Sequence, residues 1–255
     1  MSATTTPLPK AVIFDAYGTL FDVHSVVAAA EQMFPGHGDA LSQLWRQKQI
    51  EYTQLRTLAD LAGARYQPFW NITLDALRYS ARKLGLGLNG AGEKRLMDEY
   101  ACLSAYPDAV PALRRLREMR AGAGHVGLAI LSNGNPQMLD IAVKSAGMTG
   151  LFDRVLSVDA VRAYKPAPAA YALGPQAFGV AAREMVFVSS NGWDAAGAGW
   201  FGYTTFWINR AGAPAEELGV IPHGTGGGMA DLLDFIETLA PPDKSPGRSR
   251  HSPGG

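Results

Sequence analysis

The chain has 255 residues, 47% hydrophobic and 18% charged, and its 23 basic and 23 acidic residues cancel to a formal net charge of zero. This length allows one large domain or a domain with a substantial insertion. The balanced charge lacks the basic footprint of nucleic-acid-binding proteins, and no run approaches the roughly 18 apolar residues of a membrane span. We therefore expect a globular protein with a small-molecule ligand and no nucleic-acid or membrane partner.

Cysteine and histidine usage narrows the class further. Cys102 is the only cysteine, which excludes an intramolecular disulfide and agrees with a reducing compartment. The N-terminal MSATTTPLPK lacks the basic start and apolar stretch of a signal peptide, so we expect a cytoplasmic protein. The five histidines form no cluster with zinc-ligand spacing, and we expect no zinc.

The first predicted elements are a strand and a long helical segment. Residues 11–14 (AVIF) are continuously apolar, as in strands covered on both faces. Residues 23–106 contain no convincing strand, but LSQLWRQKQIEYTQL (41–55) and LDALRYSARKLG (74–85) carry apolar side chains at helical spacing. This segment predicts a helical cap domain, inserted over the carboxyl ends of the strands, where open α/β sheets bind ligands.

The remaining chain alternates between strands and helices. Apolar runs at 126–131, 155–158, 186–189 and 204–210 predict strands, and the segments 107–119, 138–147 and 167–179 predict helices. This alternation predicts a doubly wound parallel sheet of the α/β class, with a core domain formed by 10–22 and 107–240. HGTGGG (223–228) is expected to be a flexible loop, and the Pro-, Gly- and Ser-rich 241–255 a disordered tail.

Polar side chains follow several of the predicted strands. Asp15 comes directly after the first one, and the later ones are followed by Ser132 and Asn133, Lys165, and then Ser189, Asn191 and Asp194. Taken alone, an aspartate after a strand more often caps a turn, and Lys165 before a proline is more often a surface lysine. Because parallel strands end at one edge of the sheet, we expect these side chains to meet in one site.

The order of these motifs (strand-DxxGT, strand-SN, KP, strand-SSNxxD) resembles the haloacid dehalogenase superfamily over residues 10–210. The resemblance implies that the first aspartate, Asp15, is a covalent nucleophile. Most members resemble Mg²⁺-dependent phosphatases, which carry a second aspartate in the first motif and another ahead of the last aspartate. Here Tyr17 and Ser190 occupy those positions. Phosphoryl transfer needs a metal and a proton donor for its leaving oxygen, whereas halide leaves as a stable anion. The missing acids therefore favour a halide leaving group and no metal.

The segments FDAYGTLFDVHS, WRQKQIEY, ILSNGN, YKPAPAAY and FVSSNGWD resemble the L-2-haloacid dehalogenases within that superfamily. The resemblance implies that Asp15 attacks C2 of an L-2-haloalkanoate, inverts that carbon and forms an ester. Water then hydrolyses the ester and releases a D-2-hydroxy acid. The resemblance also implies a homodimer and no cofactor.

The same resemblance implies a role for each site residue. Lys165 would hold Asp15 as a carboxylate. Arg46 in the cap, with Asn133 and Trp193, would bind the departing halide, and Thr19 and Ser132 the substrate carboxylate. Tyr171, Ser189 and Asn191 would hold Lys165 or Asp194 in place, and either Asp194 or Lys165 would activate the water. The walls around the alkyl group would be Tyr17, Gln47, Ile50 and Phe69.

Several alternatives remain open at this point. Arg46 also fits a snorkelling surface arginine, Trp193 and Tyr171 fit core residues, and the hydroxyls fit simple caps. For the whole chain, a phosphatase, a hydrolase of strained-ring 2-carboxylates, or a scaffold on a decayed fold are the competing functions. Tyr17 and Ser190 argue against the phosphatase but not the ring opening. The retained Asp15, Lys165 and Asp194 argue against a scaffold.

Overall fold

The computed structural model describes residues 8–60, 62–121 and 124–239. Its main sheet has the strand order β5-β4-β1-β6-β7-β8, with every pair parallel. The strands are β1 (Ala11–Phe14), β4 (Gly127–Ser132), β5 (Arg154–Ser157), β6 (Met185–Ser189), β7 (Thr204–Ile208) and β8 (Gly224–Gly226). This confirms the predicted parallel α/β sheet.

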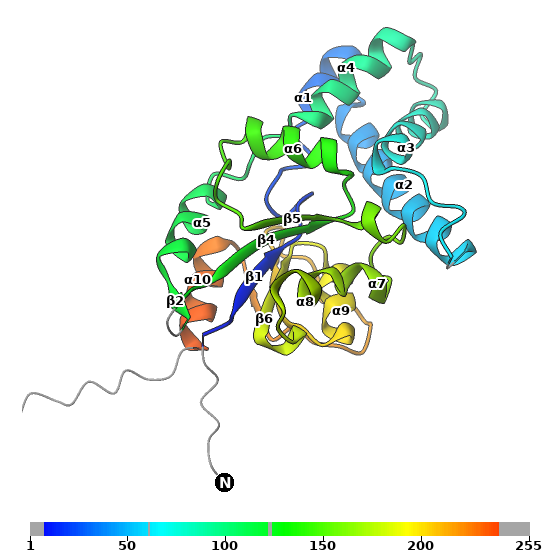
Figure 1. Cartoon of the computed structure of the whole chain (residues 1–255). Coiled ribbons are helices and arrows are strands. Elements are labelled where there is room, and N and C mark those ends of the chain that lie inside the picture. The colour runs from blue at the N-terminus through cyan, green and yellow to red at the C-terminus, as the bar shows by residue number, and fades with distance from the viewer. Residues whose placement is uncertain (1–7, 61, 122–123, 240–255) are drawn as a thin grey trace, which may run out of the picture.

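Helices cover both faces of this sheet (Figure 1). Val12 and Phe14 belong to the apolar cluster that includes residues of α5 (Ala109–Glu118), α6 (Pro136–Ser145) and α10 (Met229–Thr238). Ala11 and Ile13 belong to a second cluster, with residues of α8 (Leu173–Phe178) and α9 (Gly192–Phe201). Because successive strand residues face opposite sides, strands covered on both sides are apolar throughout, as the sequence shows.

In the described part of the insertion between β1 and α5, four helices gather beyond one end of the sheet (Figure 1). They are α1 (Val27–Met33), α2 (Gly38–Ala59), α3 (Phe69–Lys83) and α4 (Gly90–Ala101). The Trp45 ring nitrogen on α2 donates to the Thr73 carbonyl on α3 at 2.7 Å. The two chain segments that lead to these helices pair with each other, since Asp22 N donates to Ser104 O at 2.8 Å. The insertion is therefore joined to the sheet domain by two adjacent, hydrogen-bonded chain segments.

The predicted helix at 167–179 is wrong in one respect, because the structure has two short helices there, α7 (Pro168–Tyr171) and α8. Pro175 lacks the backbone N–H that would bond to the Tyr171 carbonyl in a continuous helix. That carbonyl accepts the Tyr203 hydroxyl instead, at 2.6 Å. A tertiary contact thus takes the place of the missing helical hydrogen bond.

The prediction of a loop at 223–228 is also wrong, since Gly224–Gly226 forms the edge strand β8 beside β7. A Cβ at Gly224 would lie 2.6 Å from the Phe235 ring and 2.7 Å from the Phe206 ring. Glycine therefore allows this strand to lie against two aromatic side chains. The predicted tail at 241–255 lies outside the described residues.

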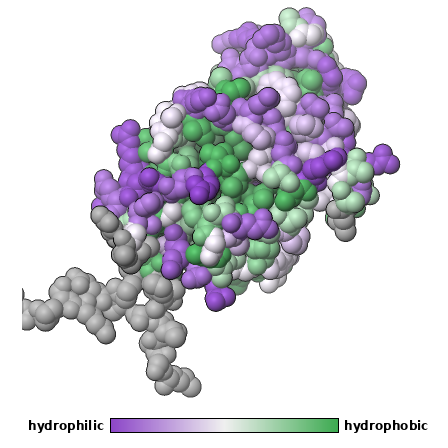
Figure 2. All heavy atoms as spheres, viewed as in Figure 1, coloured by the Kyte–Doolittle hydropathy of each residue, from purple (hydrophilic) through white to green (hydrophobic). Residues whose placement is uncertain are grey.

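The other elements are short. They are an antiparallel pair, β2 (Arg120–Ala121) with β3 (Gly124–His125), and two 3₁₀ turns at Val158–Ala160 and Ala182–Glu184. On the face drawn in Figure 2, hydrophobic residues gather between α6 and β5, where Leu139, Val143, Val155 and Leu156 line a groove. No helix in the described parts of the chain combines the length and apolar character that crossing a membrane requires.

Candidate active site

The site forms where the order of strands along the chain reverses. β1 lies between β4 and β6, and Phe14 pairs with Ile130 on one side and Val188 on the other. Asp15 follows β1, while Ser132 and Ser189 are the last residues of β4 and β6. Ligands bind in open α/β sheets at such switch points, outside the carboxyl ends of the strands. The strand-end residues therefore lie together, as the motif order predicts.

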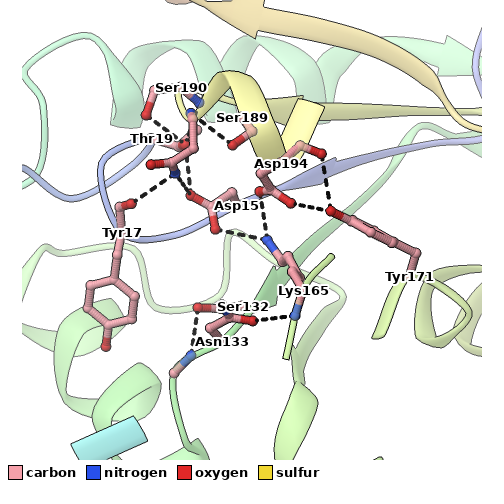
Figure 3. A network of polar contacts seen from close by, with 12 residues as sticks. Asp15, Tyr17, Thr19, Ser132, Asn133, Lys165, Tyr171, Ser189, Ser190 and Asp194 are labelled. Atoms are coloured by element: carbon pink, nitrogen blue, oxygen red, sulfur yellow. Dashed lines mark hydrogen bonds and ion pairs between the residues drawn. The ribbon is translucent and has the colours of Figure 1, made fainter. Parts of the chain in front are cut away.

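A buried group of three charges lies at the centre (Figure 3). Lys165 Nζ is 2.9 Å from Asp15 Oδ1 and 2.9 Å from Asp194 Oδ2. Burial alone would lower the pKa of Lys165, but the charges and hydrogen bonds of its two carboxylate neighbours outweigh burial, and the net shift is upward. Burial also raises the pKa of Asp194, against the opposing influence of Lys165 and Tyr171. The lysine therefore stays an ammonium that bridges two carboxylates.

Two further side chains hold the other oxygen of Asp15. Thr19 Oγ1 donates to Asp15 Oδ2 at 3.0 Å, and Asn191 Nδ2 donates to the same oxygen at 3.1 Å. Thr19 is fully buried and also accepts the Ser190 backbone N–H at 2.8 Å. The expectation that Thr19 binds the substrate carboxylate is therefore corrected, because its hydroxyl lies behind the aspartate and not on the cavity wall.

Tyr171 and Asn191 have different partners from one another. The Tyr171 hydroxyl donates to Asp194 Oδ1 at 2.7 Å, as expected for a residue that holds Asp194 in place. Asn191 contacts Asp15 and Arg46, and Ser189 Oγ accepts the Asn191 backbone N–H at 3.1 Å. The side chains of Ser189 and Asn191 therefore differ from the expectation, since Ser189 caps the turn and the Asn191 amide holds the nucleophile. The Asn191 backbone carbonyl does contact Asp194, whose N–H it accepts at 3.0 Å.

Arg46 enters the site from α2. Its Nη2 donates to the Tyr17 carbonyl at 3.0 Å and to Asn191 Oδ1 at 3.2 Å, and its Nη1 donates to Gln49 Oε1 at 2.7 Å. A snorkelling surface arginine would not make these contacts with the residues that follow β1 and β6. Arg46 therefore faces the carboxyl ends of the strands, and Asn191 connects it to Asp15.

These residues line a small, nearly closed cavity between the sheet and the inserted helices. Ser132 Oγ at its wall accepts the Gly134 N–H at 3.0 Å, and Asn133 Oδ1 accepts the Lys165 N–H at 3.0 Å. The residues that line the cavity are Asp15, Tyr17, Arg46, Ile50, Thr53, Phe69, Ser132, Asn133, Asn191 and Trp193.

Gln47 is the one predicted wall residue that the structure places elsewhere. Its side chain is exposed and does not line the cavity. A helix has 3.6 residues per turn, so positions three, four and seven after Arg46 share its face, whereas the next residue does not. That face carries Gln49, Ile50 and Thr53, and the same spacing would have identified Gln49 and Thr53 from the sequence.

Aromatic rings fill the position where a second acid occurs in the phosphatase pattern. The Tyr17 ring is buried and stacks on Tyr100, with ring centroids 5.7 Å apart, and it also packs on Phe69 at 5.5 Å. Burial raises the pKa of Tyr17 well above its ordinary value, so its hydroxyl stays neutral. Among the described residues, no three His, Cys, Asp or Glu side chains are grouped to hold a metal ion.

Comparisons with known proteins agree with this geometry. Residues 9–202 match the haloacid dehalogenase-like hydrolase family. An (S)-2-haloacid dehalogenase of Pseudomonas sp. strain YL is 46% identical over 231 residues, which is 91% of this chain and 96% of that relative. The crystal structure of an L-2-haloacid dehalogenase has 65% identity and a TM-score of 0.86, and covers 89% of this chain and 98% of its own.

A further structure bears on the chemistry. The L-2-haloacid dehalogenase of Xanthobacter autotrophicus with chloropropionic acid covalently bound has 38% identity and a TM-score of 0.81, and covers 91% of this chain and 100% of its own. The family match covers most of the chain, and the match to the Pseudomonas relative covers nearly all of that relative's length. The chain therefore belongs to the haloacid dehalogenase-like hydrolases and, within them, to the (S)-2-haloacid dehalogenases.

Proposed function

We propose that the protein hydrolyses L-2-haloalkanoic acids to D-2-hydroxyalkanoic acids through an ester on Asp15, without a metal ion. The observation that carries this proposal is a carboxylate held at both oxygens beside a small cavity, with the guanidinium of Arg46 on the cavity wall. The Xanthobacter relative with chloropropionic acid covalently bound supports a covalent intermediate.

In the first step, an oxygen of Asp15 attacks C2 from the side opposite the halogen. The new C–O bond forms as the carbon–halogen bond breaks, and the halide leaves with the electron pair. Its developing negative charge needs a positive or hydrogen-bonding neighbour but no proton. Arg46, Asn133 and Trp193, which all line the cavity, supply such neighbours.

In the second step, water attacks the carbonyl carbon of the Asp15 ester. Because the bond that breaks joins this carbon to the ester oxygen, C2 keeps the configuration set in the first step and the product is inverted. A raised pKa keeps Lys165 protonated, so we assign to Asp194 the acceptance of the water proton and its return to the leaving alkoxide of the product. To Lys165 we assign the orientation of both carboxylates. The carboxylate oxygens of Asp194 have lone pairs beyond those used by Lys165 and Tyr171.

Among the side chains that line the cavity, Ser132 is the one best suited to the substrate carboxylate. Its Oγ accepts a backbone N–H, which leaves its own proton free to donate to an anion. The apolar parts of the wall, from Ile50, Phe69 and Tyr17, surround the alkyl group. The substrate is therefore bound at its carboxylate, its halogen and its alkyl chain from three sides.

We also infer a cap domain at 23–106 on a core domain formed by 10–22 and 107–240, and a cytoplasmic homodimer. Leu55 and Leu58 on α2 are 53% and 74% exposed, and a second copy of the chain would cover such apolar side chains. Light scattering on the purified protein tests the dimer, and cell fractionation tests the location. A monomeric mass at micromolar concentration would overturn the dimer.

The function is tested by halide release from L- and D-2-chloropropionate with EDTA present. We expect release from the L form alone, and none from the Asp15→Asn variant. A single turnover in H₂¹⁸O should place the label on Asp15 and not in the product, since water attacks the ester carbonyl. Label in the first-turnover product would show direct attack on C2 and overturn the ester, and no release from either acid would overturn dehalogenation.

A further inference from the structure

We propose that Gln49 is a positioning residue for the reaction: it fixes the guanidinium of Arg46 and, because it is uncharged, leaves the positive charge available to the departing halide. The inference rests on the proposed function. It concerns a residue inside α2 that touches neither the cavity nor Asp15, and it explains how the halide side of the site is built.

The amide of Gln49 is fully buried and bonded at both ends. Its Oε1 accepts Arg46 Nη1 at 2.7 Å and the Tyr100 hydroxyl at 3.1 Å, and its Nε2 donates to Thr73 Oγ1 at 2.7 Å. The Thr73 hydroxyl in turn donates to the Phe69 carbonyl at 2.8 Å, so only its lone pairs face the amide. A flipped amide would set donor against donor at Arg46 and acceptor against acceptor at Thr73. The network therefore permits one orientation, with the oxygen toward the guanidinium.

The acceptors around Arg46 are all neutral. They are Gln49 Oε1, the Tyr17 carbonyl and Asn191 Oδ1, and within the described residues no carboxylate lies in ion-pair contact with Arg46. Other arginines of the protein have acidic partners, such as Arg78 with Glu93 at 2.7 Å and Arg210 with Asp108 at 2.9 Å. Neutral acceptors orient a guanidinium without cancelling its charge, and they use three of its five N–H donors.

This arrangement makes a specific kinetic prediction. Negative charge develops on the halogen only while the ester forms, so the charge and direction of Arg46 matter for that half-reaction. The later attack of water on the ester involves no halide. A change at Gln49 should therefore slow ester formation and weaken halide binding, and leave ester hydrolysis unchanged.

The decisive variant is Gln49→Glu, which keeps the shape and places a carboxylate beside Arg46. We expect its inhibition constant for added bromide to rise and its rate of ester formation to fall, each by about 10- to 100-fold, the range of a hydrogen bond to a charged group. Ester formation and decay are followed by mass spectrometry of the full chain in single turnovers. Gln43→Glu is the matched control, since Gln43 is exposed on the same helix and, among the described residues, its side chain pairs only with Asp39.

Thr73→Val tests the same inference without a new charge. It removes the partner of Gln49 Nε2, so the amide loses its fixed direction, and we expect a smaller loss of bromide affinity, roughly three- to tenfold. This variant decides the matter if Gln49→Glu does not fold. Parent-like bromide inhibition in the folded variants, or equal slowing of both half-reactions, would overturn the role of Gln49. If the parent protein releases no halide, the proposed function fails first, and that result is distinct.

Discussion

Charged side chains are paired with one another on the sheet side of the cavity, whereas the charged side chain on the cap side has only neutral hydrogen-bond partners among the described residues. On the sheet side, Asp15, Lys165 and Asp194 are paired at 2.9 Å, and two carboxylates against one ammonium leave a net negative charge. On the cap side, Arg46 is held by neutral oxygens and keeps its positive charge. The difference fits the proposed reaction: the nucleophile needs a fixed position, whereas the departing halide needs a cation that no acid has already neutralised.

Two residues connect these sides. Asn191 donates to Asp15 at 3.1 Å and accepts from Arg46 at 3.2 Å, so one amide orients both the proposed nucleophile and the arginine proposed to bind the halide. Tyr164, next to Lys165, donates its backbone N–H to Thr57 Oγ1 on α2 at 3.0 Å and stacks on Tyr66 with centroids 4.9 Å apart. The position of Lys165 therefore depends on the inserted helices as well as on the sheet.

Removing the ammonium should have the largest effect. Lys165→Met leaves two buried carboxylates without their partner, so we expect loss of halide release and a fall in the free energy of unfolding of about 3–5 kcal/mol. Urea unfolding and halide release measure the two. Lys144→Met is the control, because Lys144 pairs with Asp140 at 2.7 Å on the surface, where an ion pair contributes at most about 1 kcal/mol. Equal losses in both variants would contradict the bridging role.

The pH profile should separate activity from folding. The folded-state pKa of Asp194 is raised mainly by burial, so between its ordinary value and this higher one the folded state binds more protons than the unfolded state. As the pH falls through that window, protonation of Asp194 therefore raises the free energy of unfolding. The same protonation removes the proposed base. We expect activity to decline, as the pH falls, before the protein unfolds, in parallel measurements of kcat and thermal unfolding.

Tyr171 provides the matched pair for this pH experiment. Its hydroxyl lowers the pKa of Asp194, so Tyr171→Phe should move the acid limb of kcat upward by about one pH unit, the equivalent of one hydrogen bond. Tyr203→Phe removes a hydroxyl that bonds to the Tyr171 carbonyl at 2.6 Å and does not touch Asp194. An acid limb that moves equally in both variants would mean a general loss of packing.

The sequence predicts the sheet and the location of the site better than the contacts of single side chains. The parallel sheet, Asp15 and the strand-end residues were predictable because strand periodicity and chain order place them at one edge. The partners of single side chains were not: Thr19 and Asn191 both donate to Asp15 Oδ2, and both contacts depend on the tertiary structure. Gln47 was misplaced by proximity in sequence, although helical spacing from Arg46 favours Gln49 and Thr53.

Tyr164→Phe should have a smaller effect, because it loosens the contact between the two sides without changing a charge. Its hydroxyl donates to the Gln67 carbonyl ahead of α3, and we expect a loss of about 1 kcal/mol in the free energy of unfolding and a fall of a few-fold in kcat. Tyr52→Phe is the control, since within the described residues no hydrogen bond involves its hydroxyl and its ring packs on Tyr79. A rise in KM with unchanged kcat would instead show that Tyr164 affects substrate binding.

Gln47→Ala should have the smallest effect of all. Its exposed side chain points away from the cavity, so kcat, KM and the preference between two- and three-carbon acids should stay within about twofold of the parent, and the free energy of unfolding within about 0.5 kcal/mol. Ile50→Ala is the comparison on the cavity-facing side of the same helix. The smaller side chain enlarges the cavity there and should favour longer alkyl chains. If Gln47→Ala changed chain-length preference as strongly as Ile50→Ala, the helix face that carries Arg46 would have been assigned wrongly, and the roles of Gln49 and Thr53 with it.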